Sequence, residues 1–168
     1  MNKVAILGSG KSAKTFTLAI TKSSNFKLIQ IGSRNHKAAN QISSICNSHV
    51  EIKSIDKIIK SKSNNTVIVC LPGYIQPNII KSLLFYNKNI ICEKPFALKF
   101  NEAKDIFNIW QKTKKICLVN FCYNYLKPLK YVLSEIKKNS SKIHTIKISW
   151  NVMSEKKNKK NLDQVSLM

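Results

Sequence analysis

The chain has 168 residues, enough for one domain with a core of useful size, and 43% of them are hydrophobic, which excludes a disordered polymer. The formal net charge is +21, from 29 lysines and arginines against 8 acidic residues. Such a charge raises the hypothesis of a basic nucleic-acid-binding protein. The lysines are spread along the whole chain, however, and base readout prefers arginine, of which Arg34 is the single example. We therefore favour a lysine-rich surface and expect no nucleic-acid partner.

The five cysteines form no C-x-x-C pair, so neither a zinc site nor a redox motif is predicted. Cys70, Cys92 and Cys117 lie inside apolar runs, where cysteine behaves as a small hydrophobic residue. This usage is typical of a reducing compartment, and we expect a cytoplasmic protein without a metal. The first apolar run is too short for a signal peptide, and no run approaches the roughly 18 apolar residues of a membrane span. We expect no membrane contact.

Short apolar runs alternate with helical patterns over residues 1–122. Strands are predicted at 4–7, 27–31, 66–71, 89–92 and 116–121, with 50–52 as a weaker candidate. Such runs are typical of strands that are buried on both faces, as in a parallel sheet. The order of the elements predicts an α/β fold, a Rossmann-like doubly wound parallel sheet.

The predicted helices carry apolar stripes that we expect to pack in the core. The helix over 55–59 also has Ser54 as a plausible N-cap. The stripes are Ala13, Phe16 and Ile20; Ile55, Ile58 and Ile59; Ile75, Ile79 and Leu83; and Phe100, Ala103, Phe107 and Trp110.

The pattern changes after residue 122. A helix is predicted over 125–137, and residues 143–152 then alternate strictly between apolar and polar, which predicts a strand with one covered face. We expect the start of an incomplete second α+β domain at 123–153 and a basic, disordered tail at 154–168. A lone strand cannot satisfy its ladder groups, so we expect strand 143–152 to be poorly anchored or to pair with a second copy or a partner chain, with an added edge strand on the first sheet as the alternative.

A phosphate-binding loop is predicted at the start of the chain. The motif G-x-G-x-x-A lies directly after the first strand and at the start of the first helix, and it is formed by Gly8, Gly10 and Ala13. The first glycine permits a tight turn, the second lets the backbone approach a pyrophosphate, and the small third residue allows close packing. The helix N-terminus adds free N–H groups. The expected cofactor contacts are Gly8, Ser9, Gly10, Lys11, Ser12 and Ala13, with an ordinary glycine-rich turn as the alternative.

The second strand ends in "GSRN", where NAD-specific sites usually place an aspartate or glutamate for the ribose 2′-hydroxyl. Arg34 instead offers a planar, permanently charged fork that suits a 2′-phosphate. Ser33 would add a hydroxyl, and Lys37 a second charge. The predicted cofactor is therefore NADP, with NAD as the alternative.

Two later stretches, "CLPGYIQPNIIKSLL" and "NIICEKPFALKFNEAKDI", together with the glycine loop, resemble the Gfo/Idh/MocA family of oxidoreductases over residues 1–122. The most specific mark is Glu93-Lys94-Pro95 at the end of a strand. Gln76 stands where the family commonly has a histidine. The resemblance implies hydride transfer between NAD(P) and a sugar, cyclitol or similar polyol.

The resemblance also implies roles for single residues. Lys94 would be the catalytic residue, projecting into the cofactor crevice to bind the substrate hydroxyl and handle its proton. Glu93 would orient the cofactor or the lysine. The further cofactor contacts implied are Leu71, Pro72, Gln76, Glu93 and Lys94.

The chain departs from the family in its second half. The family's second domain is barely present, and its catalytic aspartate and histidine correspond to positions beyond Met168. Tyr125 stands where an arginine is common. None of His36, His49 and His144 shows a catalytic spacing. The alternatives to an oxidoreductase are therefore a non-catalytic dinucleotide-binding remnant or truncated product and, second, a basic nucleic-acid-binding protein.

Overall fold

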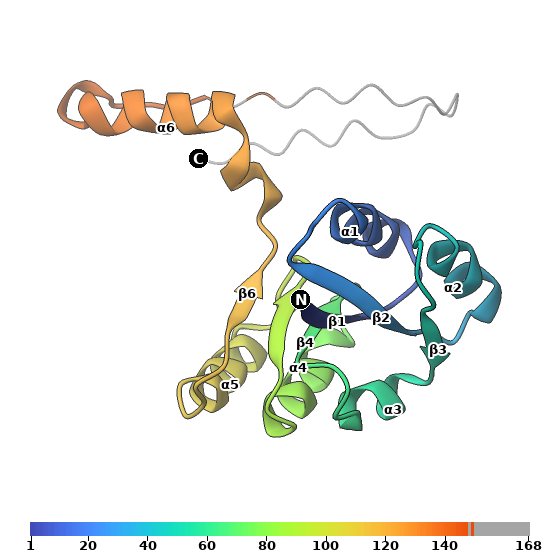
Figure 1. Ribbon diagram of the computed structural model, residues 1–168. Coiled ribbons are helices and arrows are strands. Elements are labelled where there is room, and N and C mark those ends of the chain that lie inside the picture. Colours follow the sequence, from blue (N-terminus) through green and yellow to red (C-terminus); the bar gives the residue numbers. More distant parts are fainter. Residues whose placement is uncertain (148, 150–168) are drawn as a thin grey trace, which may run out of the picture. The chain divides into compact units, whose positions relative to one another are not determined.

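The computed structural model describes residues 1–147 and 149 of the chain. Six strands form one sheet in the order β3-β2-β1-β4-β5-β6, and every neighbouring pair is parallel (Figure 1). The strand order reverses between β1 and β4, which confirms the doubly wound, Rossmann-like sheet. All six predicted strands are present, at β1 (Asn2–Leu7), β2 (Phe26–Gly32), β3 (Glu51–Lys53), β4 (Thr66–Val69), β5 (Asn89–Cys92) and β6 (Cys117–Val119).

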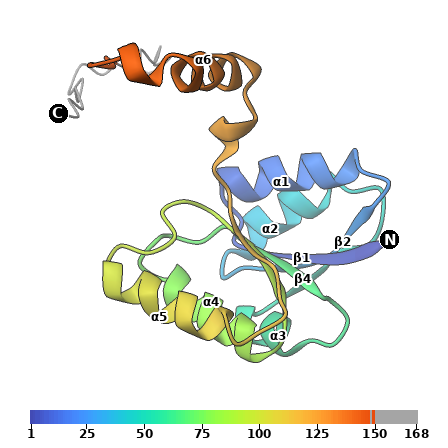
Figure 2. The same ribbon diagram turned by 90° about the vertical axis from the view of Figure 1, so that its left-hand side faces the viewer.

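Helices cover both faces of this sheet. The helices α1 (Lys11–Thr21) and α2 (His36–Ser43) lie on one face, and α3 (Ile55–Lys60), α4 (Gln76–Phe85) and α5 (Phe100–Trp110) lie on the other (Figure 2). Strand β1 shows why a continuous apolar run suits this position. Val4 and Ile6 belong to one core cluster, Ala5 and Leu7 belong to the other, and all four side chains are at most 1% exposed.

The expected inward face of α5 was wrong in two positions. Phe100 is 78% exposed and Phe107 is 47% exposed, whereas Ile106 is fully buried and Trp110 packs partly against the core. Ile106 and Phe107 lie three and four residues after Ala103, so both spacings fit a helical stripe. The contact between α5 and α4 decides that Ile106 turns inward.

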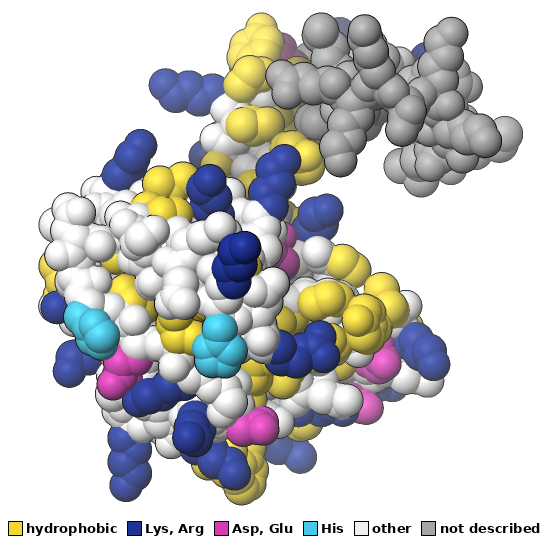
Figure 3. All heavy atoms as spheres, turned by 90° about the vertical axis from the view of Figure 1, so that its right-hand side faces the viewer, with side chains coloured by type: hydrophobic (Ala, Val, Ile, Leu, Met, Phe, Trp, Pro, Cys, Tyr) yellow, Lys and Arg dark blue, Asp and Glu magenta, His cyan; other side chains and the backbone are white. Residues whose placement is uncertain are grey.

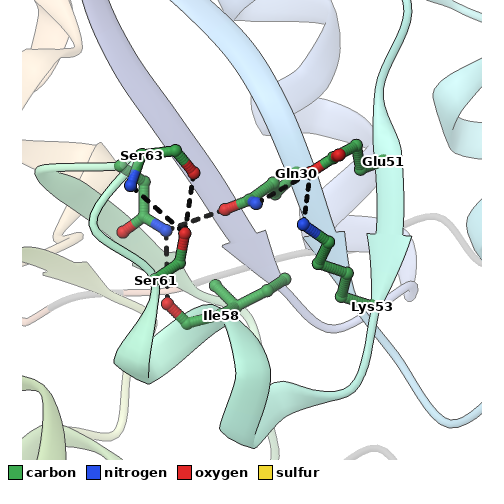
Figure 4. Close-up of polar contacts among 7 residues, drawn as sticks. Gln30, Glu51, Lys53, Ile58, Ser61 and Ser63 are labelled. Atoms are coloured by element: carbon green, nitrogen blue, oxygen red, sulfur yellow. Dashed lines mark hydrogen bonds and ion pairs between the residues drawn. The ribbon is translucent and has the colours of Figure 1, made fainter.

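A partly buried polar network links the strands at one end of the sheet (Figure 4). The Gln30 side chain donates to Glu51 (2.9 Å) and accepts from Asn64 (2.8 Å), and Lys53 forms an ion pair with Glu51 at 2.6 Å. The Lys53 and Gln30 hydrogen bonds lower the pKa of Glu51. Lys88 is 5% exposed, and its ammonium donates to the Asn64 carbonyl oxygen at 2.6 Å and to that of Ser61. The network gives partners to the buried Gln30 amide and Lys88 ammonium groups, while Asn64 Oδ1 has no partner among the described residues.

The chain divides into two compact units, and the second begins at Asn124. The helix predicted over 125–137 is α6 (Lys127–Lys138), which carries Pro128 in its first turn and buries no side chain. Short 3-10 turns lie at Cys122–Tyr125 and Ser140–Lys142. No helix of the described part of the chain is long and apolar enough to cross a membrane.

The strand predicted over 143–152 is not formed in its described part. Residues 143–147 and 149 have no regular secondary structure, because no strand among the described residues supplies ladder hydrogen bonds to them. The remainder of that segment, and the tail predicted at 154–168, lie outside the described residues.

Candidate functional site

A cleft of about 960 Å³ opens where β1, β2 and β4 end, at the reversal of strand order. Seven of the predicted contacts line it, namely Gly8, Ser9, Gly10, Ser33, Arg34, Leu71 and Pro72. Four further lining residues, Asn35, His36, Ile55 and Cys70, were not predicted as contacts. Cys70 could have been found, because it directly follows β4 and the ends of these strands meet at the cleft.

Gly8 is required by the fold itself. Its φ is +111°, and a Cβ atom there would overlap the carbonyl oxygen of Cys70. Its N–H donates to the Gly32 carbonyl at 2.8 Å, which ties the turn after β1 to the end of β2. A side chain at this position would displace the turn. This agrees with the predicted motif, which requires a glycine here.

Gly10 is different, because nothing in the described protein requires it. Its φ is −88°, and a Cβ atom there would meet no heavy atom within 4 Å. It is the N-cap of α1, and this helix begins without a side-chain hydrogen bond, whereas Asn35 caps α2 at 3.0 Å. The space in front of Gly10 and the uncapped start of α1 fit a pyrophosphate. Ala13 is fully buried and serves packing.

The turn after β2 is held together by Ser33. Its hydroxyl lies 2.7 Å from that of Ser9 and accepts from the Asn35 N–H at 3.0 Å. The hydroxyl expected to meet a phosphate is thus already used to fix the turn. Arg34 is exposed at the cleft, and no residue of the described lining is acidic.

The other predicted contacts near this end lie outside the cleft. Lys37 is exposed on α2, and Ser12 is half-buried on α1. Lys11 lines an adjoining hollow of about 540 Å³ together with Lys14, and this hollow shares Ser9 and Gly10 with the cleft.

The Glu93-Lys94-Pro95 segment follows β5 and is not part of the cleft lining. Glu93 accepts a hydrogen bond from the Asn120 side chain at 2.9 Å, a partner that sequence reasoning missed. The Lys94–Pro95 peptide bond is cis. The Lys94 side chain, which was expected to project into the cofactor crevice, is exposed in the segment that follows β5.

Gln76 does not contact the cleft either. It is fully buried at the start of α4, and its side-chain NH₂ donates to the carbonyl oxygens of Glu93 at 3.0 Å and Pro95 at 2.8 Å. Gln76 thus contacts the segment that carries Lys94.

The cysteines near the strands have the character expected of small hydrophobic residues. Burial raises the pKa of Cys70 and of Cys92 to about 12, and that of Cys117 to about 11. These thiols stay protonated at neutral pH and are poor nucleophiles. Among residues 1–147 and 149, no group of three histidine, cysteine or acidic side chains could hold a metal ion.

Residues 2–121 match the family described as "Oxidoreductase family, NAD-binding Rossmann fold", GFO_IDH_MocA. This match covers most of the chain, and the chain belongs to the Gfo/Idh/MocA family.

Among curated proteins, the chain is similar to glucose-6-phosphate 3-dehydrogenase of Bacillus subtilis, with 24% identity over 95% of this chain and 45% of the relative. Among solved structures, it resembles scyllo-inositol dehydrogenase from Lactobacillus casei with bound NAD(H) and scyllo-inositol, at a TM-score of 0.76 and 18% identity, covering 83% of this chain and 42% of that one. It also resembles a 3-ketoreductase from Actinomadura kijaniata with NADP, at a TM-score of 0.75 and 16% identity, covering 82% and 42%. These structural likenesses show the fold.

The chain spans between 30% and 45% of the length of the curated relatives that it matches. The family match covers residues 2–121 of this chain, the part described as an NAD-binding Rossmann fold.

Proposed function

We propose that the chain binds NADP in the cleft and supplies the nucleotide-binding half of an oxidoreductase that acts on a sugar, cyclitol or similar polyol. The observation that carries this proposal is Gly10. No described residue lies close enough to require a glycine there, yet the position lies at the start of α1, which has no side-chain cap. A ligand that closely approaches the backbone at Gly10 would explain the glycine. A pyrophosphate is such a ligand, because its negative charge suits the positive end of the helix dipole.

The preference for NADP rests on Arg34. It lines the cleft at the end of β2, with Ser33 held rigidly before it, and the described lining contains no carboxylate to accept a ribose 2′-hydroxyl. A guanidinium group pairs with a phosphate through two parallel hydrogen bonds. Lys37, exposed near by on α2, is the proposed second charge.

The chemistry would be divided between cofactor and protein. The bound nicotinamide ring supplies the site that takes or gives a hydride. Lys94 would bind the substrate hydroxyl and move its proton, and Glu93, held by Asn120, would keep the segment in place. The names of the glucose-6-phosphate and scyllo-inositol dehydrogenases support a sugar or cyclitol as the substrate class.

The exposure of Lys94 favours an assembly over a chain that acts alone, since a lysine in water has no means to exclude solvent from a hydride transfer. We propose that segment 143–152 is where a partner chain or second copy adds a strand. Hydrogen exchange tests this: residues 143–147 should exchange rapidly in a monomer and slowly in the assembly. Strong protection in a proven monomer would contradict the proposal.

The second candidate is a dinucleotide-binding protein without catalysis, which is favoured by the position of Lys94, exposed and outside the lining of the cleft. NADPH titration followed by its fluorescence, in parallel with turnover assays on a polyol panel, separates the two. Saturable NADPH binding with turnover supports the oxidoreductase, and binding without turnover in any assembly supports the second candidate. Absence of NADPH binding contradicts both.

Nucleic-acid binding is less well supported than either candidate. On the face shown in Figure 3, basic side chains are scattered among other side chains and form no continuous stripe. A surface that binds along the backbone of a nucleic acid would concentrate its basic side chains in one stripe or groove. A salt-dependent shift of duplex DNA on addition of the chain, unaffected by NADPH, would favour the nucleic-acid function instead.

A further inference from the structure

The backbone on both sides of Lys94 is held by one buried side chain. The NH₂ group of Gln76 donates one hydrogen to the carbonyl oxygen of Glu93 and the other to that of Pro95, at 3.0 and 2.8 Å. These two carbonyls belong to the residues immediately before and after Lys94. The side chain therefore bridges the segment across the lysine.

Gln76 is well suited to fix a backbone. It is fully buried at the first position of α4, a helix that packs against both β5 and α5. A primary amide has two N–H donors in one plane, and both are used here. Its Oε1 has no hydrogen-bond partner among the described residues. An apolar side chain would avoid that unpaired oxygen, so the contribution specific to glutamine is the pair of bonds around Lys94.

Two further contacts limit movement of the same segment. Asn120 donates to the Glu93 carboxylate at 2.9 Å. A Cβ atom on Gly73 would come within 2.9 Å of the Pro95 ring, so the loop after β4 packs closely on it. Lys94 itself is exposed, and no hydrogen bond or ion pair of its ammonium group occurs within residues 1–147 and 149. Its backbone is held, while its amine is left available.

We propose that Gln76 is a positioning residue that sets the direction of Lys94 through the carbonyls of Glu93 and Pro95. This inference rests on the proposed function, in which Lys94 meets the substrate hydroxyl. A long, exposed side chain has many rotamers, and its reach toward a substrate depends on where its Cα–Cβ bond points. Fixing the peptide groups on both sides sets that bond, and displacements of about 1 Å at such a group can lower a rate roughly a hundredfold.

The test that needs no activity is amide NMR of the full chain. The amides of Lys94 and Phe96 belong to the peptide groups whose carbonyls Gln76 binds. Gln76→Met should shift both resonances. The matched control is Gln30→Met, because Gln30 is also a buried glutamine, 1% exposed, with its own hydrogen bonds to Glu51 and Asn64. The control should lose comparable stability and leave the Lys94 and Phe96 amides in place.

A second variant guards against a folding failure. Gln76→His carries one N–H in its neutral form and can keep only one of the two bonds. We expect one of the two amides to shift strongly and the other weakly. If neither amide moves in Gln76→His or Gln76→Met beyond its shift in Gln30→Met, the positioning role is overturned.

The catalytic consequence has its own readout. In an assembly that turns over a polyol, Gln76→Met should lower kcat roughly tenfold to a hundredfold and leave the cofactor Kd unchanged. If the amides shift but kcat does not, Gln76 positions Lys94 and the proposed role of Lys94 is wrong. If kcat falls equally in Gln30→Met, the fall reflects a general loss of protein stability, and the inference is overturned.

Discussion

A Cβ atom on Gly8 would overlap the carbonyl oxygen of Cys70. Two strands thereby constrain one residue, since Gly8 follows β1 and Cys70 follows β4. We expect Gly8→Ala to lower the free energy of unfolding by at least about 2 kcal/mol, because it combines this overlap with a positive φ. Urea unfolding measures the loss, and an unfolding midpoint equal to that of the wild type would contradict this account of the turn.

Gly10→Val should have the opposite pattern. Nothing in the described protein lies within 4 Å of the new Cβ atom, so the unfolding midpoint should stay close to that of the wild type. The added methyl groups would occupy the space proposed for the pyrophosphate, and NADPH binding should be lost. Fluorescence titration and urea unfolding of the same sample give both results. Unchanged NADPH affinity in this variant would count heavily against the site.

Arg34→Ala tests the choice of cofactor. Loss of a charge-assisted hydrogen-bond pair should weaken NADP binding by about 1.5–3 kcal/mol and leave NAD binding nearly unchanged. Calorimetric titration with each dinucleotide measures the difference. Lys22→Ala, which removes one exposed positive charge at the far end of α1, serves as the control for net charge. Equal losses for the two dinucleotides in Arg34→Ala would sink the assignment.

Lys88→Met tests the buried network. The substitution keeps the length of the side chain but leaves the carbonyl oxygens of Ser61 and Asn64 without their donor. A cost of about 1–3 kcal/mol in unfolding free energy is expected for buried groups left unsatisfied. The control is Lys112→Met, an exposed lysine in the turn that follows α5, which should change stability little. A neutral result at Lys88 would mean that water replaces the ammonium group.

The thiol of Cys70 gives a prediction about pH. Burial raises its pKa to about 12, so almost none of it is thiolate at pH 8, although it lines the cleft. We expect iodoacetamide to modify the exposed Cys122 well before Cys70, and the rate at Cys70 to keep rising with pH above 9. Peptide mapping by mass spectrometry follows both sites. Rapid alkylation of Cys70 at pH 8 would show that β4 ends in a more open environment.

The local sequence was enough for the parts of the site that depend on near neighbours. The turn of Gly8, the packing of Ala13 and the N-cap of Ser54 each involve a strand end or a helix start whose residue types are restricted by backbone geometry. The apolar runs likewise predicted six strands, because a parallel strand buried on two faces has no polar alternation.

Other features depend on elements that are distant in the chain. The face of α5 that turns inward is decided by α4, and the strand expected at 143–152 needs a neighbour that the chain does not present in residues 143–147 and 149. Neither outcome could be derived from periodicity. An apolar stripe on a helix or an apolar–polar alternation in a strand indicates which side chains share a face. It does not indicate which other element will cover that face.

The sequence by itself predicted the doubly wound sheet and placed the glycine loop, Arg34 and Lys94 at the ends of its strands, because the alternation of strands and helices along the chain and the residue types at turns are local properties. Only the tertiary structure decided what Ser33 and Gln76 do. The Ser33 hydroxyl meets Ser9 from 24 positions away, and the Gln76 amide meets carbonyls 17 and 19 positions further on. A polar side chain binds whichever partners folding brings within about 3 Å, and that proximity is set by the packing of the whole sheet.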